Sequence, residues 1–61
     1  MIDPIHNLMK SAGAAFRLSG VAFFKGNETV ADDWEAIGLA CRRQAELMAN
    51  AEAMEILRKQ D

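Results

Sequence analysis

The sequence contains little that could hold a fold together covalently or through a metal ion. It has one cysteine (Cys41), one histidine (His6) and no tyrosine among its 61 residues. A single cysteine excludes an intrachain disulfide, and these two side chains cannot supply the four ligands of a structural zinc site. A chain this short buries only about 60% of the surface that its unfolded form exposes. We therefore expect association with other chains to contribute to its stability.

Long apolar runs are also missing. The most apolar stretch, residues 12–24, is interrupted by Arg17 and is too short and too polar to cross about 30 Å of hydrocarbon. The first residues carry neither the basic region nor the small-residue cleavage site of a secretory signal. We expect a protein of the cytoplasm with a reduced thiol and no membrane partner.

Charge is modest, and the hydrophobic residues are mostly helix formers. The formal net charge is −2 and the isoelectric point is near 5.2, which argues against a general nucleic-acid-binding protein. Residues 1–31 carry three basic and two acidic side chains, whereas residues 32–61 carry four basic and seven acidic ones. Hydrophobic residues make up 51% of the chain, and alanine, leucine, methionine, glutamate and arginine are plentiful. This composition favours an all-α protein.

The first predicted helix covers residues 4–25. Asp3 suits the N-cap position, and Pro4 suits the first helical position because it has no amide hydrogen to leave unpaired. Gly26 can adopt the left-handed conformation that ends a helix. A seam with alternating spacings of four and three comprises Ile5, Met9, Ala12, Phe16, Ser19 and Phe23. An alternative interpretation ends this helix at Ser19–Gly20, since glycine lowers helix propensity.

The second predicted helix covers residues 29–59. Thr29 suits its N-cap, and Asp32 then falls at the third helical position, where an acid is favourable. Arg58 and Lys59 complement the negative end of the helix dipole. Its seam keeps the same spacing and comprises Val30, Trp34, Ile37, Cys41, Gln44 or Ala45, and Met48. Two ion pairs, each between residues one helical turn apart, are expected on its surface: Arg42–Glu46 and Glu55–Lys59.

A turn at residues 26–28 brings the two seams together as an antiparallel αα-hairpin, a single all-α domain over residues 1–61. Facing residues then have numbers that sum to about 53, which places Trp34 opposite Ser19 at the centre of the core. A second apolar stripe lies outside this seam and comprises Leu8, Ala15, Leu18, Ala22, Ala36, Leu39, Ala40, Leu47 and Met54. A helix with two apolar faces is generally packed on both. We expect two hairpins to pair into a four-helix bundle, with a homodimer as the simplest assembly.

With this register the second helix projects beyond the first. The projection begins at Ala49 and extends for about ten residues, or 15 Å. Its apolar side chains would be bare in a monomer, so we expect them to contribute to an oligomer interface. The residues predicted at that interface are Leu39, Leu47, Ala53, Met54, Ile56 and Leu57.

Small residues share faces on both helices. Gly13 and Gly20 lie on one face of the first helix, and Ala31, Gly38 and Ala45 lie on one face of the second. Small side chains at such spacings let two helix backbones approach closely, which is the interpretation that we favour. The alternative is a shallow groove that accepts a partner helix.

Nothing in the sequence predicts catalysis, a cofactor or a metal site. Cys41 falls on the seam, where a cysteine is a small hydrophobe far more often than a nucleophile. His6 is expected to be exposed in the first helical turn. Three neighbouring acids are explained by the positive end of the second helix: Asp32, Asp33 and Glu35. We expect a protein without enzymatic activity.

The function that this sequence favours is binding. We expect a small interaction or regulatory protein, an adaptor or an inhibitor, that binds another macromolecule, in the first place a protein, through a helical-bundle surface. Such short helical chains are typical of accessory proteins of phages and plasmids. Two alternatives remain open: a purely structural oligomer subunit, and a dimer that binds RNA or a nucleotide through a stripe of the first helix. That stripe comprises His6, Lys10, Arg17, Phe24 and Lys25, with Gly13 and Gly20 between them.

Overall fold

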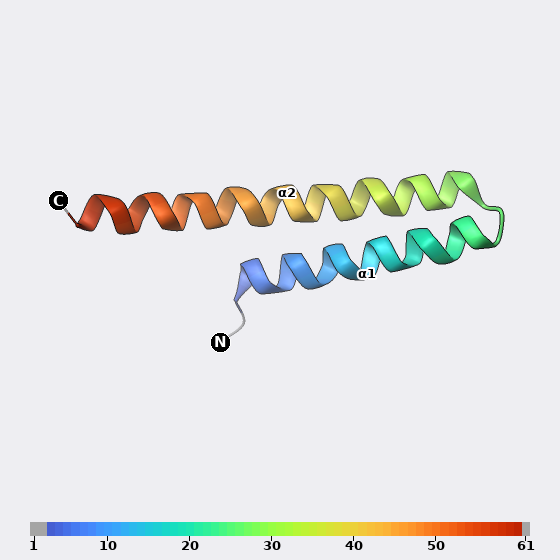
Figure 1. The fold of residues 1–61 in the computed structure, drawn as a ribbon, viewed down its shortest axis with the longest axis horizontal. Helices are drawn as coiled ribbons and strands as arrows, with labels where there is room; N and C mark the ends of the chain where they lie inside the picture. The colour runs from blue at the N-terminus through green and yellow to red at the C-terminus, as the bar shows by residue number, and fades with distance from the viewer. Residues whose placement is uncertain (1–2, 61) are drawn as a thin grey trace.

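The computed structural model describes residues 3–60, which form two helices. Helix α1 covers Pro4–Phe24 and helix α2 covers Glu28–Lys59. They run antiparallel and side by side, joined by a tight connection at one end that we call the tip (Figure 1). The predicted antiparallel αα-hairpin is confirmed, with helix boundaries within one residue of those expected. The alternative in which the first helix ends at Ser19–Gly20 is wrong, because α1 continues to Phe24.

Asp3 and Pro4 begin α1 as predicted. The Asp3 carboxylate accepts a hydrogen bond from the backbone N–H of Ile5 at 3.0 Å. This bond satisfies one of the N–H groups that have no partner within the first turn of a helix. Pro4 follows at the first helical position, where its missing amide hydrogen costs no hydrogen bond.

The tip is closed by a Schellman motif around Gly26. The Asn27 N–H donates to the Ala22 carbonyl at 2.9 Å, and the Gly26 N–H donates to the Phe23 carbonyl at 3.0 Å. Gly26 has a φ of 78°, in the left-handed region that glycine adopts without steric cost. The predicted role of this glycine as a helix terminator is confirmed.

Asn27, and not Thr29, is the N-cap of α2. The side-chain oxygen of Asn27 accepts a hydrogen bond from the Val30 N–H at 3.4 Å. Asparagine is at least as good an N-cap as threonine, and it follows the left-handed glycine directly. The helix therefore begins at Glu28, and Thr29 lies inside its first turn. The predicted N-cap was wrong by two residues.

The contact between the helices is made by small residues. The buried positions are Ala12, Ala15 and Ala22 of α1 and Ala31, Gly38 and Ala45 of α2. Half-buried residues alternate with them along the same seam: Ile5, Leu8, Ser19, Trp34, Cys41 and Met48. In the described part of the chain, no side chain larger than alanine is buried. The interface between the two helices is therefore narrow, and their backbones approach closely because only small side chains lie between them.

Half of the residues predicted on the seam lie there: Ile5, Ala12, Ser19, Trp34, Cys41 and Met48, with Ala45 as the alternative to Gln44. The others are exposed instead: Met9, Phe16, Phe23, Val30, Ile37 and the polar Gln44. Each lies one position away from a seam residue, so the seam is rotated by part of a turn from the predicted one. Ala15 replaces Phe16, for example, and Ala22 replaces Phe23. Helices approach most closely over their smallest side chains, because bulky rings between them would hold the axes apart.

Two contacts define the register of the hairpin. The Ser19 hydroxyl donates a hydrogen bond to the Ala31 carbonyl oxygen at 2.7 Å. The ring of Phe16 lies over Gly38, where an added Cβ atom would be 2.7 Å from the Cε1 atom of the ring. The residue numbers of these two pairs sum to 50 and 54, so the register lies within one helical turn of the predicted one, in which facing numbers sum to about 53.

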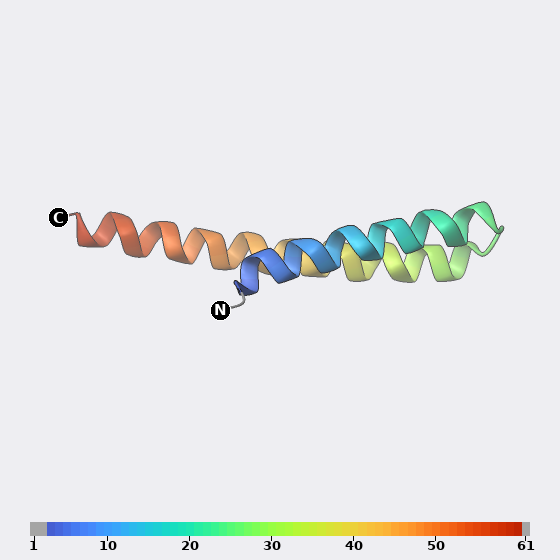
Figure 2. The ribbon, with the colours of Figure 1, turned by 90° about the horizontal axis from the view of Figure 1, so that it is seen from below.

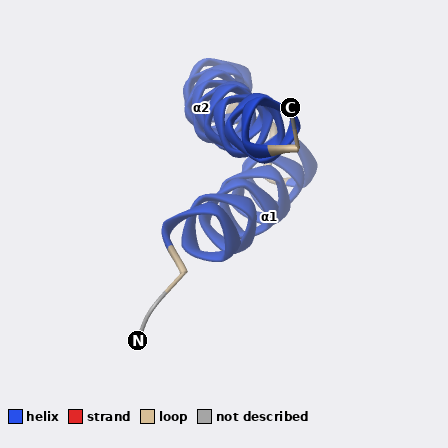
Figure 3. Cartoon of the chain, turned by 90° about the vertical axis from the view of Figure 1, so that its left-hand side faces the viewer, coloured by secondary structure: helices blue, strands red, loops and turns tan. Residues whose placement is uncertain are grey.

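The hairpin is long and thin because α2 extends well beyond the start of α1 (Figures 1 and 2). Viewed along the long axis, the two helices cross at an angle (Figure 3). The molecule measures 54 × 21 × 10 Å, and its radius of gyration is 15.3 Å. A compact chain of this length would have a radius of gyration of about 10.5 Å. Residues 49–60 are all exposed, which confirms the predicted projection of the second helix.

Neither of the described helices has an apolar stretch long enough to cross a membrane.

Candidate interaction surfaces

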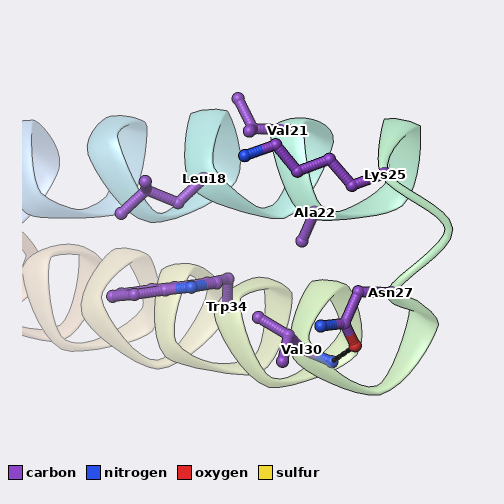
Figure 4. A pocket seen from close by; sticks show the side chains of 7 residues that line it. All are labelled: Leu18, Val21, Ala22, Lys25, Asn27, Val30 and Trp34. Atoms are coloured by element: carbon purple, nitrogen blue, oxygen red, sulfur yellow. Dashed lines mark hydrogen bonds between the residues drawn. The ribbon is translucent and has the colours of Figure 1, made fainter.

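A groove at the tip is lined mainly by apolar side chains from both helices (Figure 4). We call it the tip groove; its volume is about 320 Å³, and it is lined by Leu18, Val21, Ala22, Lys25, Asn27, Val30 and Trp34. The Trp34 ring extends along α2, below Leu18, while the Lys25 chain runs back along α1 toward Val21 (Figure 4). The Schellman turn and the Asn27 cap hold the two helix ends that form the walls.

Trp34 is a wall of this groove and not the centre of the core. It was expected opposite Ser19, but Ser19 bonds to Ala31 and the seam of α2 passes through Ala31 and Gly38. The indole ring is therefore half-buried on the hairpin and half available to a partner. It is the only tryptophan of the chain, which makes it a natural reporter of whatever covers the groove.

A second hollow lies on α2, and three of its four lining residues are charged. It has a volume of about 400 Å³ and is lined by Leu39, Arg42, Arg43 and Glu46. The predicted Arg42–Glu46 pair is confirmed at 3.2 Å, but both side chains are well exposed, so its stabilising effect is small. Over residues 3–60 this is the only ion pair, and the predicted Glu55–Lys59 pair is not formed.

Large apolar side chains also follow the other edge of α1. Met9, Phe16 and Phe23 are seven residues apart and all exposed; we call them the phenylalanine edge. At 100° per residue, this edge and Leu18 lie on opposite sides of the buried alanines of α1. Phe24, close to the tip, is the most exposed large side chain, at 94%.

The stripe predicted to bind RNA or a nucleotide keeps most of its members together. Because α1 is continuous, His6, Lys10, Arg17 and Phe24 remain on one exposed side of it. A Cβ atom added at either of the two glycines between them, Gly13 and Gly20, would meet nothing within 4 Å. The expectation that these glycines permit close helix approach is therefore wrong within the hairpin. Lys25 lies apart from the stripe, in the tip groove.

The residues predicted at an oligomer interface are all exposed in the hairpin. They are Leu39, Leu47, Ala53, Met54, Ile56 and Leu57. Their spacing places them on more than one side of α2: Leu47 and Met54 share one side, Leu39 and Leu57 share a second, and Ile56 lies on a third. A single flat interface cannot cover all six.

The described residues 3–60 offer no cluster of three or more His, Cys, Asp or Glu side chains that could hold a metal ion. Cys41 is a free thiol, half-buried on the seam. His6 is exposed near the start of α1, as expected. The acids Asp32, Asp33 and Glu35 are exposed along the first turns of α2.

No protein-family model, no curated protein and no solved structure matches the chain. Its function has to be inferred from the surfaces described above. Sequence reasoning missed the tip groove, and Val21 was in none of the predicted sets. A signal for it exists, because Ala14, Leu18, Val21 and Lys25 recur at spacings of four, three and four on one side of α1.

Proposed function

We propose that this chain is a small non-enzymatic interaction protein, an adaptor or an inhibitor, that acts by binding another protein through exposed apolar helix surfaces. In this proposal it works as a homodimer, in which two hairpins form a four-helix bundle. One observation carries the proposal: in residues 3–60 every large aliphatic or aromatic side chain is at least partly exposed, and the buried residues are alanines and one glycine.

The accessible surface supports this proposal quantitatively. The hairpin exposes 5114 Å². A compact monomer of 6.7 kDa would expose about 3900 Å². The excess of about 1200 Å² per chain corresponds to about 2400 Å² for two chains, which is within the range of stable homodimer interfaces.

Self-association leaves apolar surface for a second partner. The tip groove and the phenylalanine edge lie on opposite sides of the hairpin, so a dimer contact on one of these sides leaves the other exposed. Large aromatic side chains on the remaining surface are typical hot spots of protein interfaces. Phe23 and Phe24, adjacent to one another at the tip, are the residues that we assign to this second contact.

Affinity capture from the source cell tests the partner. The unmodified chain is compared with the Phe23→Ser, Phe24→Ser double variant and with Asn50→Ala, an exposed polar substitution, as the control. We expect one protein to be retained by the unmodified chain and by Asn50→Ala but lost with the double variant. Retention of the same proteins by all three chains, or of none, contradicts the proposal.

A second candidate function is binding of RNA or a nucleotide by the α1 stripe. It is favoured by the continuity of α1, which aligns Lys10, Arg17 and Phe24 with two uncovered glycines beside them. Two observations argue against it: the net charge is −2, and Lys10 and Arg17 are the only basic side chains aligned in the stripe. A Lys10→Ala, Arg17→Ala variant should lose affinity for structured RNA at low salt and keep its helix content. No binding by the unmodified chain contradicts this candidate.

A further inference from the structure

The tip groove is the start of a second seam that follows α2 over its whole length. From Val30, one side of α2 continues through apolar residues at helical spacing: Val30, Ile37, Ala40, Leu47, Ala51 and Met54. Of these, Val30, Ile37, Leu47 and Met54 are exposed large side chains of the hairpin. We call this side, together with the tip groove, the groove face. An apolar stripe that continues over several heptads is the surface that a second helix covers in a coiled coil, whether parallel or antiparallel.

The lengths of the helices indicate how a second copy fits. At the tip the hairpin is two helices wide, whereas at the other end residues 49–59 of α2 stand alone (Figure 1). A second hairpin placed antiparallel on the groove face brings its own residues 49–59 over the tip groove. Its α1 does not reach that level, so nothing competes for the space beside Leu18 and Trp34.

Gln44 indicates where the two-fold axis lies. It is a polar, exposed residue in an otherwise mostly apolar seam, and it lies at the middle of α2, which covers Glu28–Lys59. Full antiparallel overlap of two α2 helices therefore brings Gln44 opposite Gln44 of the second copy. Two amides can donate to and accept from one another there, and a single polar pair in an apolar seam fixes register.

The charges at the two ends of the seam favour the same direction. Asp33 lies beside Val30 at the start of the seam, and Arg58 lies at its end. Antiparallel pairing of α2 helices places Asp33 level with Glu55 of the second copy and within one turn of its Arg58, so one opposite charge offsets the like charge, whereas parallel pairing would bring Asp33 close to Asp33 with no opposite charge at that level. The antiparallel arrangement also places the positive end of each helix dipole beside the negative end of the other.

From these observations we infer that the tip groove binds residues 49–59 of a second copy of this chain, in an antiparallel dimer whose two-fold axis passes at Gln44. This inference rests on the proposed homodimer and deepens it, because it specifies the covered face, the direction and the register. The phenylalanine edge, on the other side of the seam, remains exposed in this dimer.

Disulfide trapping tests the register. Single-cysteine chains are made in a Cys41→Ala background, which removes the natural thiol. Under mild oxidation Gln44→Cys is expected to form a covalent dimer rapidly, whereas Arg42→Cys, at an exposed residue on the opposite side of α2, is not. Val30→Cys should not cross-link with itself but should cross-link with Arg58→Cys when the two chains are mixed.

Two matched pairs of substitutions test the face. Met54→Lys is compared with Ile56→Lys, at side chains that are 60% and 58% exposed, and Leu47→Glu with Leu39→Glu, at 55% and 50%. Only Met54 and Leu47 lie on the groove face. We expect Met54→Lys and Leu47→Glu to weaken dimerisation by about tenfold or more and the other two to change it little. Trp34 emission should shift to the red with the first two substitutions only.

The outcomes separate this inference from the proposed function. If the unmodified chain is monomeric in sedimentation equilibrium, both the proposed homodimer and this inference are wrong. A dimer that cross-links through Arg42→Cys, or that is weakened by Ile56→Lys and Leu39→Glu instead, overturns the inference alone. The homodimer would then stand with another face as its interface.

Discussion

Gly38 is the residue at which the two helices depend most directly on the absence of a side chain. The ring of Phe16 occupies the space where a Cβ atom of residue 38 would lie, with three ring carbons at 2.7–3.0 Å from that position. Real Cβ atoms do not tolerate such contacts, so a larger residue here must displace the ring. Phe16 is itself partly exposed, and displacement would remove it from the hairpin surface.

We predict that Gly38→Ala destabilises the hairpin although alanine is the better helix former. The gain in helix propensity is about 1 kcal/mol, whereas forcing extra atoms into a filled site costs about 1–3 kcal/mol. In a Phe16→Ala background the ring is absent, and the same substitution should become stabilising. Urea unfolding of the four chains of this double-mutant cycle, at one protein concentration, measures the reversal of sign.

Gly13→Ala is the matched control for this prediction. A Cβ atom at Gly13 meets nothing within 4 Å, so only the propensity term acts, and the substitution should stabilise α1 by up to about 1 kcal/mol. If Gly13→Ala were as destabilising as Gly38→Ala, the space above Gly13 would be filled by a second chain.

The rotation of the seam shows why residue size misled the sequence interpretation. On α1, two of the three buried alanines are followed by a phenylalanine, so two adjacent heptad stripes both satisfy the helical spacing: one through Ala15 and Ala22, the other through Phe16 and Phe23. Choosing the larger residues is correct where a core must be filled from several sides. Two helices alone have no such volume to fill, and they pack over the smaller stripe.

At the scale of helices and turns, most features could be predicted from short-range chemistry. Asp3, Pro4 and Gly26 act as expected because each decides the conformation of its own backbone or of the next turn. The start of α2 was misplaced because Asn27 and Thr29 are both suitable N-cap residues. The sequence does not show how many residues the turn occupies, and therefore which of the two caps the helix. The Schellman hydrogen bonds decide for Asn27.

We predict that Asn27→Ala destabilises the protein and that Thr29→Ala does not. The Asn27 side chain accepts the Val30 N–H and lines the tip groove, so its loss should cost about 0.5–2 kcal/mol. Thr29 lies within the first turn of α2, where alanine is the better helix former. Chemical unfolding followed by circular dichroism compares the two variants. A larger loss for Thr29→Ala would place the cap two residues later.

For the whole molecule, the hydrophobic pattern predicts association with another chain but not the surface through which it occurs. Two apolar stripes on each helix exceed what one helix contact can cover, and this much follows from spacing alone. The tip groove could not be located in advance, because its walls depend on which stripe forms the seam. With Phe16 and Phe23 assigned to the core, Val21 had no role, and Lys25 was assigned to the stripe on α1 instead of the groove.

We predict that the melting temperature of the protein rises with its concentration. Association stabilises the folded state by mass action, so raising the concentration about a hundredfold should raise the melting temperature by several degrees. A chain truncated after Asn50 loses the segment that we place in the tip groove of the second copy, and its melting temperature should be lower and independent of concentration. Circular dichroism at several concentrations measures both. A constant melting temperature for the full chain contradicts association.

The length of the dimer distinguishes two ways of covering the projecting end of α2. If residues 49–59 occupy the tip groove of a second hairpin, the two hairpins overlap along their whole length, and the longest dimension stays near the 54 Å of one chain. If the projecting ends only pair with one another, the particle is lengthened to roughly 90 Å, because just about 15 Å is shared. Small-angle X-ray scattering of the unmodified dimer measures this dimension. We expect the shorter value, because full overlap covers the exposed seam of α2 from Val30 to Met54 and places Asp33 within one turn of Arg58 at its two ends, whereas end-to-end pairing leaves Trp34 and the tip groove bare.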